Sequence, residues 1–215
     1  MNVKMKAYIF DLDGTLLDST DIWKNIDVEF LKKRGIEIPR DYIDTVLSMS
    51  FPEAADYTIK RFALPDSAPG LMRKWNDMAV YAYGNTVRMK PNAKEYLLAL
   101  RERGAKLAVA TSLPAGLYGP ALRNHGIYDW FDALCSTDEV GCGKTRPDVF
   151  LLAANKLGVP PCGCVVFEDI LAAVKSAKSI GMTVYGVYDK ASQSDWEQIK
   201  ETADGVILDF RNALD

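Results

Sequence analysis

Two aspartates, Asp11 and Asp13, lie directly after the short apolar segment Met5–Phe10. This segment is typical of a buried β-strand, which would deliver both acids at its carboxyl end. Carboxylates this close repel each other unless a cation or a proton lies between them. Mg²⁺ takes oxygen ligands from one or two carboxylates and still accepts substrate phosphate oxygens. The pair therefore suggests metal-assisted chemistry on a phosphorylated molecule, with Gly14 supplying backbone freedom for the turn.

Polar residues follow other apolar segments in the same way. They are Thr111 and Ser112 after Lys106–Ala110, Lys144 in the stretch after Ala133–Cys135, and Glu168 and Asp169 after Cys164–Phe167. A Thr-Ser pair alone is typical of a turn, and a single lysine is typically solvated. In an open parallel sheet, however, ligands bind beyond the carboxyl ends of the strands. The shared placement therefore predicts one site, in which hydroxyl groups and an ammonium group hold a phosphoryl group.

The elements that would position this site alternate after Pro91. Helices are expected over 92–103, 116–124, 147–157 and 169–180, and strands over 106–110, 164–167 and 183–187, with a short apolar step near 133–135. This alternation is typical of a parallel sheet with helices on its faces. Between Thr20 and Gly84 the apolar spacing is helical and is broken by prolines, which predicts about four helices. The fold class is therefore a doubly wound, Rossmann-like α/β core (1–17 and 86–215) with an inserted helical cap (18–85).

Composition excludes several classes of function. The chain has 215 residues, of which 48% are hydrophobic and 26% charged, as in an ordinary globular protein. The net charge of −3 offers no basic field for a nucleic acid or an anionic membrane. The first residues are too weakly apolar for a signal peptide or a membrane span. Four cysteines without a CxxC pair, and a single histidine, favour structural thiols in the cytoplasm over a zinc site.

The segments that carry these residues resemble the four motifs of the haloacid dehalogenase superfamily, in order. The matching segments are Asp11-Leu-Asp-Gly-Thr-Leu-Leu-Asp-Ser, Val109-Ala-Thr-Ser, Gly143-Lys-Thr-Arg-Pro-Asp-Val-Phe, and Val165-Val-Phe-Glu-Asp with Gly181-Met. The helical insertion after the first motif is similar to the cap of the β-phosphoglucomutase-like branch. Ile170 and Ala173 depart from the serine and glycine common in the fourth motif.

The resemblance implies a role for each residue. Asp11 would attack phosphorus and become an aspartyl phosphate, and Asp13 would act as acid and base. Mg²⁺ would be held by Asp11, the Asp13 backbone carbonyl and Asp169, with Glu168 nearby through water. Thr111, Ser112 and Lys144 would hold the phosphoryl oxygens. The acid at Asp13 argues against the dehalogenase branch, because halide needs no proton.

The expected function is a Mg²⁺-dependent phosphomonoesterase acting on a small phosphorylated metabolite such as a sugar phosphate, in a monomer. One alternative is a hexose-phosphate mutase, although Trp23 replaces the hinge histidine of mutases and the cap segment Leu47–Glu53 lacks a positive charge. A phosphonate-cleaving enzyme would need a cap lysine such as Lys24. A rival of another class is a non-catalytic regulatory protein that binds phosphometabolites, which would not need both Asp11 and Asp13.

Overall fold

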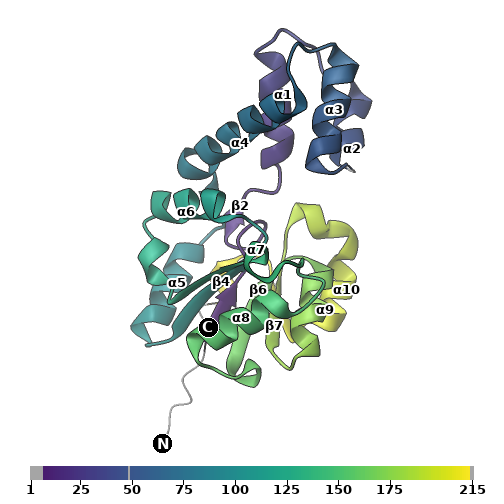
Figure 1. Ribbon diagram of the computed structural model, residues 1–215. Helices are drawn as coiled ribbons and strands as arrows, with labels where there is room; N and C mark the ends of the chain where they lie inside the picture. Colours follow the sequence, from purple (N-terminus) through teal and green to yellow (C-terminus); the bar gives the residue numbers. More distant parts are fainter. Residues whose placement is uncertain (1–6, 48, 214–215) are drawn as a thin grey trace, which may run out of the picture. The chain divides into compact units, whose positions relative to one another are not determined.

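The computed structural model describes residues 7–47 and 49–213. A parallel β-sheet forms the core of its α/β unit, which comprises Met1–Thr20 and Val87–Asp215 (Figure 1). Over these residues the sheet has six strands in the order β5-β4-β1-β6-β7-β8. The strands are β1 (Ala7–Phe10), β4 (Lys106–Thr111), β5 (Ala133–Ser136), β6 (Cys164–Glu168), β7 (Thr183–Val187) and β8 (Gly205–Ile207). The chain moves to one side of β1 with β4 and β5 and returns on the other side with β6. The topological switch point therefore lies between β1 and β6.

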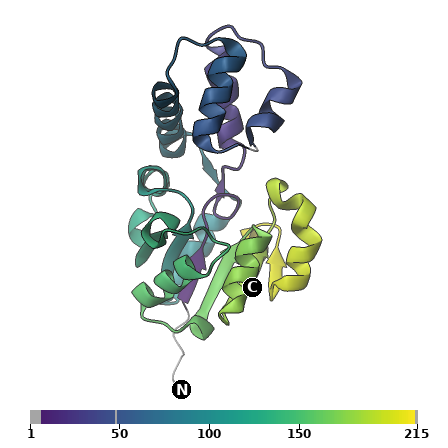
Figure 2. The ribbon, with the colours of Figure 1, turned by 45° about the vertical axis from the view of Figure 1, so that its right-hand side comes forward.

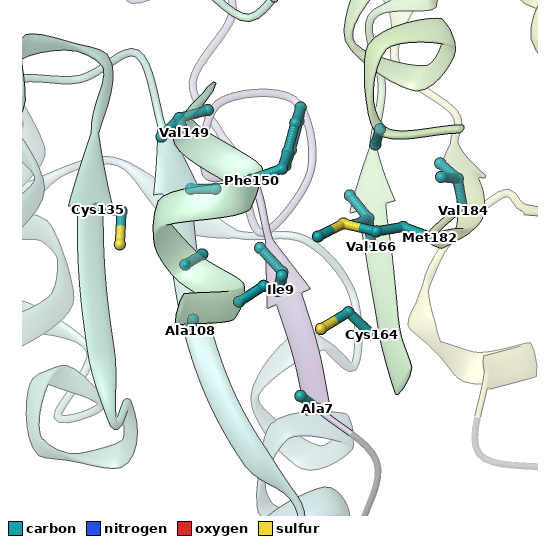
Figure 3. Close-up of a cluster of buried hydrophobic side chains, with 14 of the residues drawn as sticks. Ala7, Ile9, Ala108, Cys135, Val149, Phe150, Cys164, Val166, Met182 and Val184 are labelled. Carbon is teal, nitrogen blue, oxygen red and sulfur yellow. The ribbon is translucent and has the colours of Figure 1, made fainter. Parts of the chain in front are cut away.

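Helices cover both faces of this sheet, as the fold class predicted from the sequence requires. They are α5 (Ala93–Glu102), α6 (Ala115–Asn124), α7 (Thr137–Val140), α8 (Asp148–Leu157), α9 (Leu171–Ser179) and α10 (Trp196–Thr202). On one face, Ile9, Val166 and Val184 from neighbouring strands belong to one buried cluster with Phe150 of α8 (Figure 3). The predicted strands and helices are present, whereas α7, α10 and β8 were not predicted. The start of the first predicted strand, Met5 and Lys6, lies outside the described residues.

Aromatic rings in register fill the opposite face of the sheet. Phe10 pairs with Phe167, and Phe167 pairs with Tyr185, on three adjacent strands. Their rings stack at centroid distances of 5.0 and 5.4 Å. Tyr96 of α5 and Phe210 of η4 (Phe210–Ala213) cover them. Stacked rings and large apolar burial make this face rigid just below the strand ends that carry Asp11 and Glu168.

A separate helical unit, Asp21–Thr86, is inserted after the first strand. Its helices are α1 (Ile22–Lys32), α2 (Arg40–Leu47), α3 (Phe51–Phe62) and α4 (Ala68–Asn85), which agrees with the expected four (Figure 2). Leu71, Trp75, Ala79 and Tyr83 recur every fourth residue on α4 and are all buried, so they form the core-facing stripe of an amphipathic helix. Two of the prolines that suggested helix boundaries, Pro52 and Pro69, occupy the first turns of α3 and α4, where a missing N–H is tolerated. No helix within the described ranges is both long and apolar enough to cross a membrane.

Asp27 is a half-buried acid within the helical unit. It lies beside the Tyr42 hydroxyl, whose oxygen is 2.7 Å from Thr58 Oγ1, and Thr58 in turn donates to the Ala54 carbonyl. Burial raises the pKa of Asp27 to about 7, although the hydrogen bond with Tyr42 lowers it in part. Between about pH 4 and pH 7 the native state therefore holds a proton that the unfolded state has released. The free energy of unfolding should fall as the pH rises through this window.

Asp27→Asn should remove this dependence, because an amide cannot ionise. At pH 8 we expect the free energy of unfolding of Asp27→Asn to exceed that of the wild type by about 2 kcal/mol, less than the full shift would give because the group is partly solvated. Urea unfolding at several pH values, followed by tryptophan fluorescence, measures the difference. Asp56→Asn, at an exposed position of α3, serves as the matched control. Equal pH slopes for wild type and Asp27→Asn would contradict the assignment.

Candidate active site

Carboxylates from two adjacent strands meet at the switch point. Asp11 follows β1, and its backbone N–H donates to the Phe167 carbonyl of β6 at 3.0 Å. Glu168 ends β6 and Asp169 follows it. Asp11, Glu168 and Asp169 are 4%, 0% and 2% exposed, and each offers an oxygen within 4.8 Å of the others. The strand pairing thus produces a buried acid cluster.

Lys144 inserts its ammonium group into this acid cluster. Its Nζ forms ion pairs with Asp11 and, at 2.8 Å, with Glu168 Oε2. Burial disfavours the charged ammonium, but attraction to Asp11 and Glu168 outweighs it and raises the pKa of Lys144. Burial also raises the pKa of Glu168 to about 7, against the attraction of Lys144. The pKa of Asp169 is raised as well, by burial and then by its two acidic neighbours.

The donor set fits a divalent cation. Three carboxylates face one ammonium group, so full ionisation would leave two negative charges buried. Buried charge of this size is unfavourable without a counter-ion. Oxygen-only ligands at close spacing are the preference of hard cations such as Mg²⁺ and Mn²⁺ rather than of Zn²⁺ or Cu²⁺. The arrangement of these side chains is therefore suited to Mg²⁺.

The turn after β1 brings Gly14 against Asp169. The Leu12 carbonyl accepts hydrogen bonds from the N–H groups of Thr15 and Leu17, which closes the turn. Gly14 has φ +78°, in agreement with the backbone freedom expected of it. A Cβ built on Gly14 would lie 2.3 Å from Asp169 Oδ2. Only glycine therefore satisfies both the backbone conformation and the space.

Hydroxyl groups orient Asp169. Thr15 Oγ1 donates to Asp169 Oδ1 at 3.0 Å, and Ser192 Oγ donates to Asp169 Oδ2 at 3.3 Å. The backbone N–H groups of Asp169 and Ile170 both donate to Glu168 Oε1 at 3.1 Å. Neither Thr15 nor Ser192 was predicted from the sequence. Thr15 could have been suspected from its place beside Gly14, whereas nothing in the sequence marks Ser192.

The remaining predicted residues lie on neighbouring segments. Asp13 is half-buried, and its Oδ1 accepts a 2.5 Å hydrogen bond from Ser19. Thr111 ends β4 beside β1 and is buried, while Ser112 is exposed. Thr111 Oγ1 accepts the Leu113 N–H at 3.1 Å. Close oxygen spacing and ion pairs bring together four of the predicted residues, Asp11, Lys144, Glu168 and Asp169.

This fold and this cluster define an α/β protein with a buried cluster of acids at its switch point. A family model described as haloacid dehalogenase-like hydrolase matches residues 5–181, and the chain belongs to this family. The predictions of the superfamily, of the fold class and of a hydrolase are therefore confirmed.

Individual relatives cover most of the chain. A phosphorylated carbohydrates phosphatase of Thermotoga maritima is 28% identical over 184 residues, 85% of each chain. Hexitol phosphatase B of Escherichia coli is 27% identical over 193 residues, which are 88% of this chain and 86% of that one. The crystal structure of a candidate β-phosphoglucomutase from Thermotoga maritima superposes with a TM-score of 0.82 at 25% identity and 94% coverage of both chains.

Proposed function

We propose that the chain is a Mg²⁺-dependent phosphatase that hydrolyses small phosphorylated carbohydrates through an aspartyl phosphate at Asp11. The observation that carries this proposal is the buried cluster of three carboxylates and Lys144 at the switch point. Such a cluster suits a site where a cation and an anionic phosphoryl group must be held together. Two relatives support this substrate class by their names, phosphorylated carbohydrates phosphatase and hexitol phosphatase B.

Asp11, Asp169 and the Asp13 backbone carbonyl would hold Mg²⁺, with Glu168 nearby through water. When bound, Mg²⁺ would neutralise the phosphoryl oxygens and so reduce their repulsion of the Asp11 carboxylate. The hydroxyl groups of Thr15 and Ser192 donate to Asp169 and keep its carboxylate oriented for this role. Ordered ligands matter because Mg²⁺ demands near-ideal octahedral geometry.

The chain's own residues would perform two displacements. An Asp11 carboxylate oxygen bonds to phosphorus while the bond from phosphorus to the leaving oxygen breaks, and protonated Asp13 gives that oxygen its proton. Water then bonds to the phosphorus, loses a proton to Asp13, and releases inorganic phosphate and the Asp11 carboxylate. Lys144, Thr111 and Ser112 would hold the phosphoryl oxygens throughout. Ser19, bound to Asp13, would restrict the rotation of that acid.

The helical insertion, 18–85, would act as a cap that excludes water other than the nucleophile. We further propose a monomer in the cytoplasm, where a reducing environment suits the four cysteines, all of them free thiols.

A panel of phosphate esters tests the substrate class. We expect purified protein with Mg²⁺ to release inorganic phosphate from hexose and hexitol phosphates with a larger kcat/KM than from nucleotides, and EDTA to abolish the release. Phosphorus NMR of a hexose 1-phosphate reaction distinguishes a mutase, which would form the 6-phosphate without free phosphate. Binding without turnover across the panel would contradict the proposal and favour the regulatory alternative.

A further inference from the structure

The chain crosses between its two units twice, and the residues that form each crossing belong to the α/β unit. The first crossing, residues 17–20, starts with β2 (Leu17–Asp18), and the second, residues 87–90, contains β3 (Arg88–Met89). These two strands pair antiparallel. Each crossing ends in a polar residue, Thr20 or Lys90, and these two residues share one partner.

That partner is Asp189, which follows β7. Thr20 Oγ1 donates to Asp189 Oδ1 at 3.0 Å, and Lys90 Nζ lies 2.5 Å from Asp189 Oδ2. Lys90 also donates to the Tyr188 carbonyl at 3.2 Å. The side chains of Asp189 and Lys90 are only 3% and 11% exposed. A buried ion pair with several hydrogen bonds holds a more definite geometry than a solvated surface pair.

The same carboxylate fixes the start of η3 (Lys190–Asp195). Asp189 Oδ1 accepts the Ala191 N–H at 2.9 Å, and the Asp189 carbonyl accepts the Ser192 N–H at 3.2 Å. Ser192 is 8% exposed, and its hydroxyl group donates to Asp169 Oδ2. Continuous hydrogen bonds therefore run from both crossings through Asp189 to Ser192 and Asp169.

We propose that Asp189 is a positioning residue, which fastens both crossings to η3 and thereby sets the orientation of Asp169. This inference rests on the proposed function in one respect, which is that Asp169 is a ligand of the metal ion. Loss of the Lys90 or Asp189 charge would loosen η3, withdraw the Ser192 hydroxyl from Asp169 and weaken binding of the cation. Outer-shell partners of metal ligands affect affinity in this way because they fix the direction of ligand lone pairs.

Lys90→Met and Asp189→Asn test this role, because both keep the side-chain length and remove one charge. We expect residues 189–195 to exchange amide hydrogens about 10-fold faster than in the wild type. We also expect Mn²⁺, titrated by electron paramagnetic resonance, to bind about 10-fold more weakly. In the phosphatase assay kcat at fixed Mg²⁺ should fall, while KM for the phosphate ester changes less than about 3-fold. Lys90→Arg keeps the charge and should restore Mn²⁺ affinity.

Lys178→Met is the matched control. Lys178 pairs with Asp204 at 2.7 Å, and Asp204 also accepts a backbone N–H, from Val184, but neither residue contacts η3 or Asp169 in the described contacts. The control should leave Mn²⁺ affinity and the exchange of 189–195 unchanged.

Unchanged exchange and Mn²⁺ affinity in Lys90→Met would overturn the proposal, as would equal losses in Lys178→Met. If Asp189→Asn does not fold, Lys90→Met and Thr20→Val decide the outcome by the same measurements. If the wild type binds Mn²⁺ but releases no phosphate, the proposed function fails. The hydrogen-exchange and Mn²⁺-binding measurements then still test the positioning role of Asp189. If the wild type binds no Mn²⁺, a positioning role toward a metal ligand is overturned as well.

Discussion

Asp11→Asn should lower kcat for phosphate release by about 10⁴-fold or more, because an amide oxygen is too weak a nucleophile to attack phosphorus. The substitution preserves shape and removes one of three crowded carboxylates, so the fold should persist. Steady-state assays under saturating Mg²⁺ measure the loss. Acid quenching followed by mass spectrometry should find a phosphoryl adduct on the Asp11 peptide of the wild type and none in the variant.

Asp132→Asn provides the control for the chemical change. Asp132 accepts the Leu107 N–H at 2.9 Å at the start of β4, the end of the strand opposite to Thr111. This variant should keep wild-type kcat even if it unfolds at a lower temperature. Activity of Asp11→Asn above about 1% of the wild-type value would exclude Asp11 as the nucleophile.

Gly14→Ala should reduce kcat/KM by about 10²- to 10³-fold, through displacement of the Asp169 carboxylate. The new methyl group would meet Asp169 Oδ2 at 2.3 Å, and relief of this clash must break the hydrogen bond from Thr15 or the one from Ser192. Strain at φ +78° adds about 1–2 kcal/mol of destabilisation. Kinetics over a range of Mg²⁺ concentrations and thermal unfolding measure the two effects separately.

Gly104→Ala separates the clash from the strain. Gly104 has φ +72°, and nothing lies within 4 Å of the position that an added Cβ would take. Gly104→Ala should therefore lose only the stability that the strain costs and keep its activity, whereas Gly14→Ala should lose more stability and also activity. A loss of activity no larger than in Gly104→Ala would show that Asp169 accommodates the methyl group.

The sequence predicted the residues whose position depends on strand order alone. Asp11, Glu168 and Asp169 each follow an apolar run, and parallel strands bring their carboxyl ends to one edge. Lys144 was predicted less directly, because it reaches the cluster from a loop and its motif resemblance indicated it.

Residues held by loop geometry could not be predicted in this way. Ser192 contacts Asp169, which is 23 residues away in the sequence. Asp189 contacts Thr20 and Lys90, which are 169 and 99 residues away. Such contacts depend on where η3 folds back, which has no periodic signal. The strand β8 was missed because it has only three residues, Gly205–Ile207, and follows no long apolar run.

The central place of β1 in the sheet has a consequence for synthesis. Its neighbours, β4 and β6, begin 99 and 157 residues after its first residue, Ala7 (106 − 7 and 164 − 7). During translation Asp11 therefore emerges long before either strand that can pair with β1, and Glu168 and Asp169 emerge only with the end of β6. Contacts this distant in sequence form late and slowly. The nascent chain should thus acquire its acid cluster only near the end of folding, and an incomplete chain could neither chelate a cation there nor attack a phosphate ester.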